Sequence, residues 1–213
     1  MSFAVLHFEL WAQHCDVGIW AGLSAGTELV EDVDLKGELQ SRFDRGMTRY
    51  SSLLGDLGLR YKISKPMNVS LNYRMGQRQE NDGYLSLRHR LSLDLTYEWD
   101  FGKPELDLRV RYQAGLENGA GEGGIADLRE GFRFRLRGST ELMDDLDGDL
   151  SAELFRSRDM TGFYWSDWRL RFELTRKINK HQDLTIGYLF QQETLVADPL
   201  MEHIISVGYS FDL

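Results

Sequence analysis

The sequence predicts an all-β protein, an antiparallel up-and-down transmembrane β-barrel of about 10–12 strands with a polar, charged lumen. Three observations carry this prediction. Apolar and polar side chains alternate with a period of two, the alternating segments are long enough to cross a bilayer, and tight turns alternate with longer loops. No run of about 18 apolar residues occurs, which excludes a helical membrane protein.

The average composition describes an acidic, hydrophilic chain. Among 213 residues there are 25 Lys+Arg and 34 Asp+Glu, for a formal net charge of −9, and the mean hydropathy is −0.41. Such a charge argues against nucleic-acid binding. The single cysteine, Cys15, excludes a disulfide framework and a cysteine-based zinc site. These averages add both faces of every strand, so they do not exclude a barrel with a polar interior.

We expect residues 1–14 to be a residual signal peptide or a disordered N-terminus, followed by the barrel at 15–213. The stretch from Leu10 to Gln13 is typical of the end of a signal peptide, although His7 and Glu9 interrupt the apolar run. Cys15 is expected to be a free thiol rather than a lipid anchor.

Residues 84–99 show the period of two most clearly. Leu91, Leu93 and Leu95 share one face, whereas Ser92, Asp94 and Thr96 share the other. A helix would distribute these charges around its whole circumference, whereas a strand separates them.

The same alternation recurs from one end of the chain to the other. The first segment, 16–25, places Val17, Ile19, Ala21 and Leu23 opposite glycines and Trp20. The others are 33–42, 53–63, 68–78, 84–99, 106–113, 132–137, 149–154, 167–174, 183–191 and 202–213. This gives about eleven candidates. Since bacterial single-chain barrels have even strand numbers, we expect that an N-terminal strand is missed or the early hairpin is misinterpreted.

The connections alternate in length, as expected for periplasmic turns and extracellular loops. The tight turns are 64–66, 100–104, 141–145 and 179–182, and the longer loops are 43–48, 79–83, 117–127, 156–162 and 193–200.

Alternation alone does not decide whether the apolar face contacts lipid or fills the interior of a soluble, lipocalin-like barrel. Strand length, a lumen too wide for apolar side chains alone, and aromatic residues near both ends of the apolar face favour lipid. These aromatic girdle residues are Tyr61, Tyr97, Trp99, Tyr209 and Phe211 at the short-turn end, with Trp168 and Tyr188 toward the loops.

Several stretches resemble a family of small bacterial outer-membrane β-barrels catalogued only as a domain of unknown function. They are residues 18–22, 57–62, 72–74, 82–90, 108–113 and 207–211. The alternating last strand also resembles the signal read by the barrel assembly machinery, with Leu213 in place of the usual aromatic residue. The resemblance implies the fold and an outer-membrane location, and it brings no activity.

If the apolar face contacts lipid, the polar face forms a charged lumen in which cross-strand ion pairs are expected. Acids gather toward the short turns and arginines toward the loops, which suggests an anion-guiding gradient. The predicted lumen residues are Arg42, Arg74, Arg78, Arg88, Arg90, Arg109, Arg111, Arg129, Arg133, Arg135, Arg169, Arg171, Asp94, Glu98, Asp107, Glu153, Asp167 and Glu173.

Three function classes follow. The first is a structural or accessory component of a Gram-negative envelope without a catalytic site. The second is a small passive pore with anion preference at its outer mouth. The third is a lipid-modifying enzyme, for which His89, His203 and Ser166 are the candidates. We expect no cofactor, metal or nucleic acid. The expected partners are outer-membrane lipids, lipopolysaccharide, the assembly machinery and an envelope protein complex.

Overall fold

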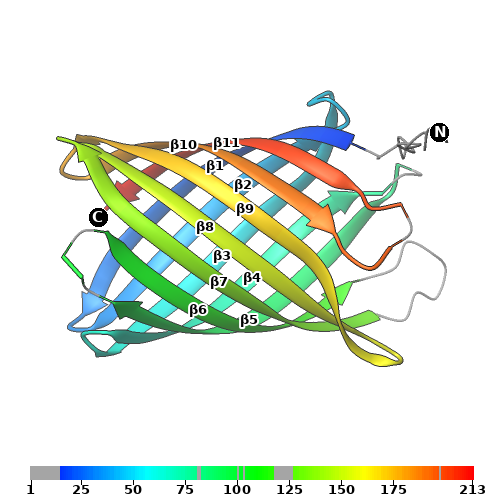
Figure 1. Cartoon of the computed structure of the whole chain (residues 1–213), viewed down its shortest axis with the longest axis horizontal. Helices are drawn as coiled ribbons and strands as arrows, with labels where there is room; N and C mark the ends of the chain where they lie inside the picture. The colour runs from blue at the N-terminus through cyan, green and yellow to red at the C-terminus, as the bar shows by residue number, and fades with distance from the viewer. Residues whose placement is uncertain (1–14, 81–82, 100, 103, 118–126, 197) are drawn as a thin grey trace, which may run out of the picture.

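The chain forms a closed β-barrel (Figure 1). The computed structural model describes residues 15–80, 83–99, 101–102, 104–117, 127–196 and 198–213. The strands are β1 (Cys15–Val30), β2 (Val33–Asp44), β3 (Arg49–Ser64), β4 (Met67–Gln79), β5 (Leu85–Trp99), β6 (Glu105–Glu117), β7 (Asp127–Met143), β8 (Leu146–Asp159), β9 (Gly162–Asn179), β10 (Gln182–Glu193) and β11 (Met201–Asp212). The predicted all-β barrel of about 10–12 strands is thereby confirmed.

The barrel closes through one parallel pair. Every strand pairs antiparallel with its neighbour in sequence, but β1 and β11 run in the same direction, with Ile19 opposite Ile205. The expectation of an even strand number is therefore wrong for the described residues, because a parallel seam lets an odd number close. Leu213 N donates a hydrogen bond to Gly26 O at 2.9 Å, so the end of the chain stays on the seam.

A designed disulfide tests the seam. Ala21 and Val207 are register partners and both are exposed on the outer wall. With Cys15→Ser to remove the native thiol, Ala21→Cys combined with Val207→Cys is expected to oxidise to an intramolecular disulfide, because directly opposed residues have the required spacing. Ala21→Cys combined with Tyr209→Cys, which lies two residues out of register, is the control. Mass spectrometry without reductant should find the bond in the first pair alone, and its absence there would refute the parallel register.

The strands have 12 to 18 residues, and most extend beyond the segments that alternate in sequence. One predicted loop, 156–162, is wrong, because β8 and β9 continue to a tight turn. There Asp159 Oδ1 accepts hydrogen bonds from the backbone N–H groups of Thr161 at 2.7 Å and Gly162 at 3.1 Å. Gly162 has φ of +133°, a value that glycine tolerates.

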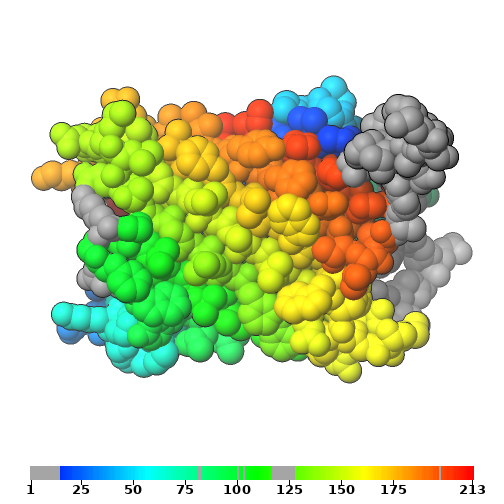
Figure 2. Space-filling model, viewed as in Figure 1, coloured from blue at the N-terminus to red at the C-terminus, as the bar shows by residue number. Residues whose placement is uncertain are grey.

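The apolar face points away from the barrel axis. In β5, Leu91, Leu93 and Leu95 are about half exposed, whereas Ser92 and Asp94 are 5% and 4% exposed. This is the reverse of a soluble barrel, in which the leucines would fill the interior. Figure 2 shows one face of the wall as a continuous surface. Among the described residues, no helix is long and apolar enough to span a membrane.

Candidate functional site: the charged lumen

The lumen contains a water-accessible cavity of about 790 Å³. Its lining includes eleven Lys or Arg and ten Asp or Glu, whereas the whole chain has 25 against 34. The positive charge of the sequence is therefore concentrated inside the barrel. The cavity reaches from the short-turn end, where Glu28, Asp34 and Asp212 line it, inward to Trp20 and Arg42.

A four-residue ion cluster, here called the Glu153 cluster, ties four consecutive strands together. Glu153 on β8 is 7% exposed. Its Oε1 accepts a hydrogen bond from Arg109 of β6 at 3.0 Å. Its Oε2 accepts hydrogen bonds from Arg133 of β7 at 2.7 Å and from Arg169 of β9 at 3.2 Å. Each guanidinium approaches from a different strand, so one carboxylate bridges the wall from β6 to β9.

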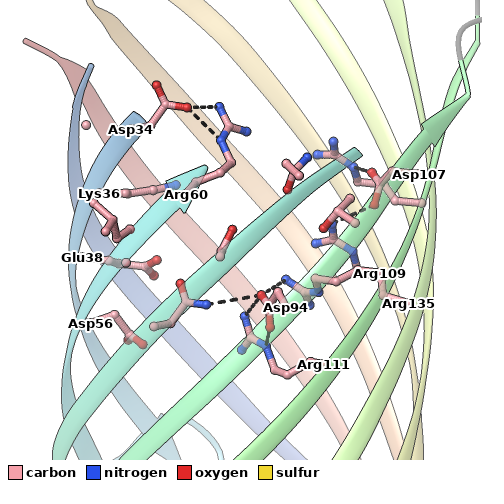
Figure 3. A pocket seen from close by; sticks show the side chains of 18 of the residues that line it. Asp34, Lys36, Glu38, Asp56, Arg60, Asp94, Asp107, Arg109, Arg111 and Arg135 are labelled. Atoms are coloured by element: carbon pink, nitrogen blue, oxygen red, sulfur yellow. Dashed lines mark hydrogen bonds and ion pairs between the residues drawn. The ribbon is translucent and has the colours of Figure 1, made fainter. Parts of the chain in front are cut away.

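Two further aspartates bind arginines of the lumen (Figure 3). Asp94 on β5 accepts two bonds of 2.6 Å from Arg111 Nε and Nη2, a bidentate geometry that suits a planar guanidinium. Asp107 on β6 accepts from Arg135 at 2.8 Å and also from Arg137. Arg109 Nη1 lies 3.9 Å from Asp94 Oδ2 and so links Asp94 to the Glu153 cluster.

The wall around the parallel seam carries a different set of side chains. Trp20, Leu189 and Ile204 form a buried apolar cluster in the barrel, with exposed fractions of 8%, 0% and 3%. Trp20 lines the cavity, and the guanidinium of Arg42 stacks 3.9 Å above its ring. Small residues make room for this cluster. At Gly187, a Cβ atom would lie 2.5 Å from Ser206 Oγ.

The sequence prediction did not select these apolar residues, although a signal was present. Leu189 has the parity of Asp183, Thr185 and Gln191 within its strand, so the same alternation that places those polar groups inside places Leu189 there too. An apolar residue out of phase was the sign of an interior contact.

The other predicted lumen residues are distributed along the barrel axis. Three of their carboxylates accept hydrogen bonds: Glu98 from Asn68 at 2.9 Å, Asp167 from Gln191 at 3.3 Å, and Glu173 from Arg171 at 3.4 Å. Arg90 faces the lumen from β5, directly opposite Arg74. Arg78 and Arg129 are exposed at the loop ends of β4 and β7 and do not line the cavity.

Glu80 follows β4 at the loop end, where Nη2 of Arg88 lies 3.3 Å from the Glu80 Oε1. The hydroxyl of Ser86 donates to the same oxygen at 2.6 Å. This hydrogen bond is the main reason why the pKa of the Glu80 carboxyl lies below its ordinary value. Glu80 is thus held as an anion at the rim.

The predicted girdle residues lie on the outer wall, where several make ring contacts. Tyr97 packs against Trp99, and Tyr209 against Phe211, with centroid separations of 4.9 and 4.8 Å. Toward the loops, Trp168 packs on Phe190 at 5.2 Å. Tyr61 is 51% exposed and Tyr188 45% exposed.

The structure does not bring the three enzyme candidates together. Nδ1 of His89 is 2.7 Å from the hydroxyl of Tyr73, and Nδ1 of His203 is 2.6 Å from that of Tyr188. The hydroxyl of Ser166 accepts from Ser157 at 2.9 Å. These histidines therefore contact tyrosines rather than a serine nucleophile. In the described residues, no group of three His, Cys, Asp or Glu side chains is arranged to hold a metal ion.

Comparisons with known proteins support the barrel architecture. A family model described as "Protein of unknown function (DUF2490)" matches residues 17–201. The structure is similar to the NanC porin, with a TM-score of 0.55 and 13% identity over 90% of this chain and 99% of the porin chain. It is also similar to the beta domain of the Bordetella autotransporter BrkA, with a TM-score of 0.52 and 11% identity over 86% of this chain and 85% of that domain. No curated protein matches the sequence.

Proposed function

The chain belongs to the DUF2490 family of unknown function, and from this premise we propose that it is a structural or accessory β-barrel of the Gram-negative outer membrane, without a catalytic site. The observation that carries the proposal is the Glu153 cluster, in which one buried carboxylate connects guanidinium groups from three other strands. Ion pairs of this kind fix the shape of the lumen. They leave few charged groups of β6–β9 free to act on a solute.

The outer wall supports the proposed lipid environment. At the loop end, Arg158 binds Glu130 at 2.6 Å, whereas the exposed Arg156 lies 5.6 and 5.7 Å from the ring centroids of Phe163 and Trp165. A cation set among interfacial aromatic rings suits the phosphate groups of lipopolysaccharide. A loop end that contacts lipopolysaccharide lies at the cell surface, so the short turns face the periplasm.

A passive pore is the second candidate, favoured by the 790 Å³ cavity that lies among the charged residues of the lumen. The two candidates differ in whether the cavity continues through the layer of Trp20, Leu189 and Ile204. An occluded lumen supports a structural role, whereas an ion-conducting path supports a pore.

Planar-bilayer recording of Trp20→Ala separates the two candidates. The wild-type barrel is expected to show no stable open channel, because the indole narrows the lumen beside Leu189 and Ile204. Removing it should produce discrete conductance steps. Trp165→Ala, an equal truncation on the outer wall where Trp165 is 43% exposed, should stay closed. Stable wild-type conductance with anion preference would refute the structural proposal in favour of the pore.

A further inference from the structure

We infer that the lumen contains a binding site for a small oxyanion, formed by Arg42, Arg74 and Arg90 beside Trp20. The site lies near the inner end of the cavity, which Arg42, Arg74 and Trp20 line. The inference goes beyond the proposed function and does not depend on whether the lumen conducts ions.

Within the described part of the chain, two of these arginines have no carboxylate partner. Among the residues that the structure describes, no carboxylate oxygen lies within the 4.0 Å ion-pair limit of Arg42 or Arg90. Among these residues, Arg42 donates a hydrogen bond only to Gln40 Oε1, at 2.7 Å, and its guanidinium stacks on the Trp20 ring. The other lumen arginines of this region, such as Arg133 and Arg169, bind Glu153.

The three guanidinium groups repel one another. Arg74 and Arg90 are direct cross-strand partners on β4 and β5, an arrangement that destabilises a sheet when the charges are alike. Both charges also act on Arg42. The acid whose field reaches Arg90 is Asp56, and Arg74 Nε already binds it at 2.8 and 2.9 Å. Glu202 acts on Arg42 from β11, but beyond ion-pair distance.

Acids are plentiful elsewhere in the lumen. The cavity lining holds ten carboxylates, and several of them line its mouth. A chain with net charge −9 thus has, among its described residues, two neighbouring lumen arginines, Arg42 and Arg90, without an ion-paired acid. An incoming oxyanion would neutralise this excess charge, as a carboxylate of the chain does for the neighbouring arginines.

The ligand chemistry follows from the donors. Guanidinium groups donate paired N–H bonds to two oxygens of one group, the geometry that a phosphate or a carboxylate presents and that chloride lacks. The proposed ligand is therefore a free phosphate or a small solute with a carboxylate.

Isothermal titration of the full chain in detergent micelles at low ionic strength tests the site. Inorganic phosphate and acetate are titrated separately, with chloride at matched ionic strength as the reference. Phosphate or acetate should bind and chloride should not, and the stronger binder identifies the ligand class. Arg90→Gln should weaken that binding about tenfold or more. Arg60→Gln, which removes a paired arginine near the mouth (Asp34 at 2.6 Å), should change it less than about twofold.

Thermal unfolding of the same variants separates binding from a structural role. Since Arg90 holds no carboxylate, Arg90→Gln removes repulsion and leaves no orphaned acid, so its Tm should equal or exceed that of the wild type. Arg42→Gln is a second variant in which oxyanion binding should be lost. The inference would be overturned by any of four results. These are no oxyanion binding by the wild type, chloride binding as strong as oxyanion binding, an equal loss of binding in Arg60→Gln, or a lowered Tm in Arg90→Gln.

Discussion

Replacing Glu153 with glutamine is expected to lower the free energy of unfolding by about 3–5 kcal/mol, the range found when one member of a buried ion pair is removed. Glu153 accepts from Arg109, Arg133 and Arg169, and its side chain is 8% exposed. Glutamine fills nearly the same volume. The change therefore removes the negative charge without opening a cavity, and it leaves three arginines close together with fewer acids between them. The measurement is urea unfolding of the barrel in lipid vesicles.

An exposed ion pair of the same barrel provides the control. Asp147 lies 2.9 Å from Lys177, and the side chains are 27% and 49% exposed. Because water screens this pair, Asp147→Asn should cost less than about 1 kcal/mol. If Glu153→Gln unfolds at the same urea concentration as Asp147→Asn, the Glu153 cluster does not hold the barrel together, and the observation behind the structural proposal is lost.

The sequence predicted which side chains face inward more completely than it predicted which ones meet. In β5, alternation assigned Arg90 and Asp94 to the lumen, because the side chains of a strand point to opposite faces in turn. The bond between Arg109 and Glu153 spans β6 to β8 and depends on the tilt and register of three strands. Register is fixed by the connections and by closure, which residue types alone do not specify.

The parallel seam was beyond sequence reasoning for a related reason. A tight turn determines that its two strands are antiparallel, but β1 and β11 have no turn between them. Their relative direction follows from the number of strands. The rule that bacterial single-chain barrels have even strand numbers predicts an antiparallel seam. Ile19 and Ile205 carry no signal that they pair in parallel.

The rule that predicted the fold missed the buried apolar cluster of Trp20, Leu189 and Ile204. Assigning apolar residues to lipid and polar residues to the lumen explains Leu91 and Asp94, but it passes over Trp20 and Ile204. Both keep the parity of inward residues and fill space beside small ones such as Gly18 and Ser206. Whether a large apolar side chain fits inside depends on what faces it across the barrel.

Leu93→Arg is expected to destabilise the barrel by about 2–4 kcal/mol in a bilayer, because a lipid-facing cation near the bilayer midplane is costly. Leu93 lies near the middle of β5 and is 52% exposed on the outer wall, between Leu71 and Tyr112 of the neighbouring strands. The change faces away from the lumen, so the ion pairs inside stay intact. Urea unfolding in vesicles measures the loss.

Leu85→Arg makes the same substitution at the loop end of β5, where Leu85 is 58% exposed. Both variants lose similar leucine surface and gain the same charge, so only their depth in the bilayer differs. In lipid, the cost at Leu85 should fall to about 0–1 kcal/mol, since an arginine near the interface reaches water. A barrel whose outer wall faced water would give equal and small effects at both positions. The difference between the two variants therefore measures whether lipid surrounds the outer wall.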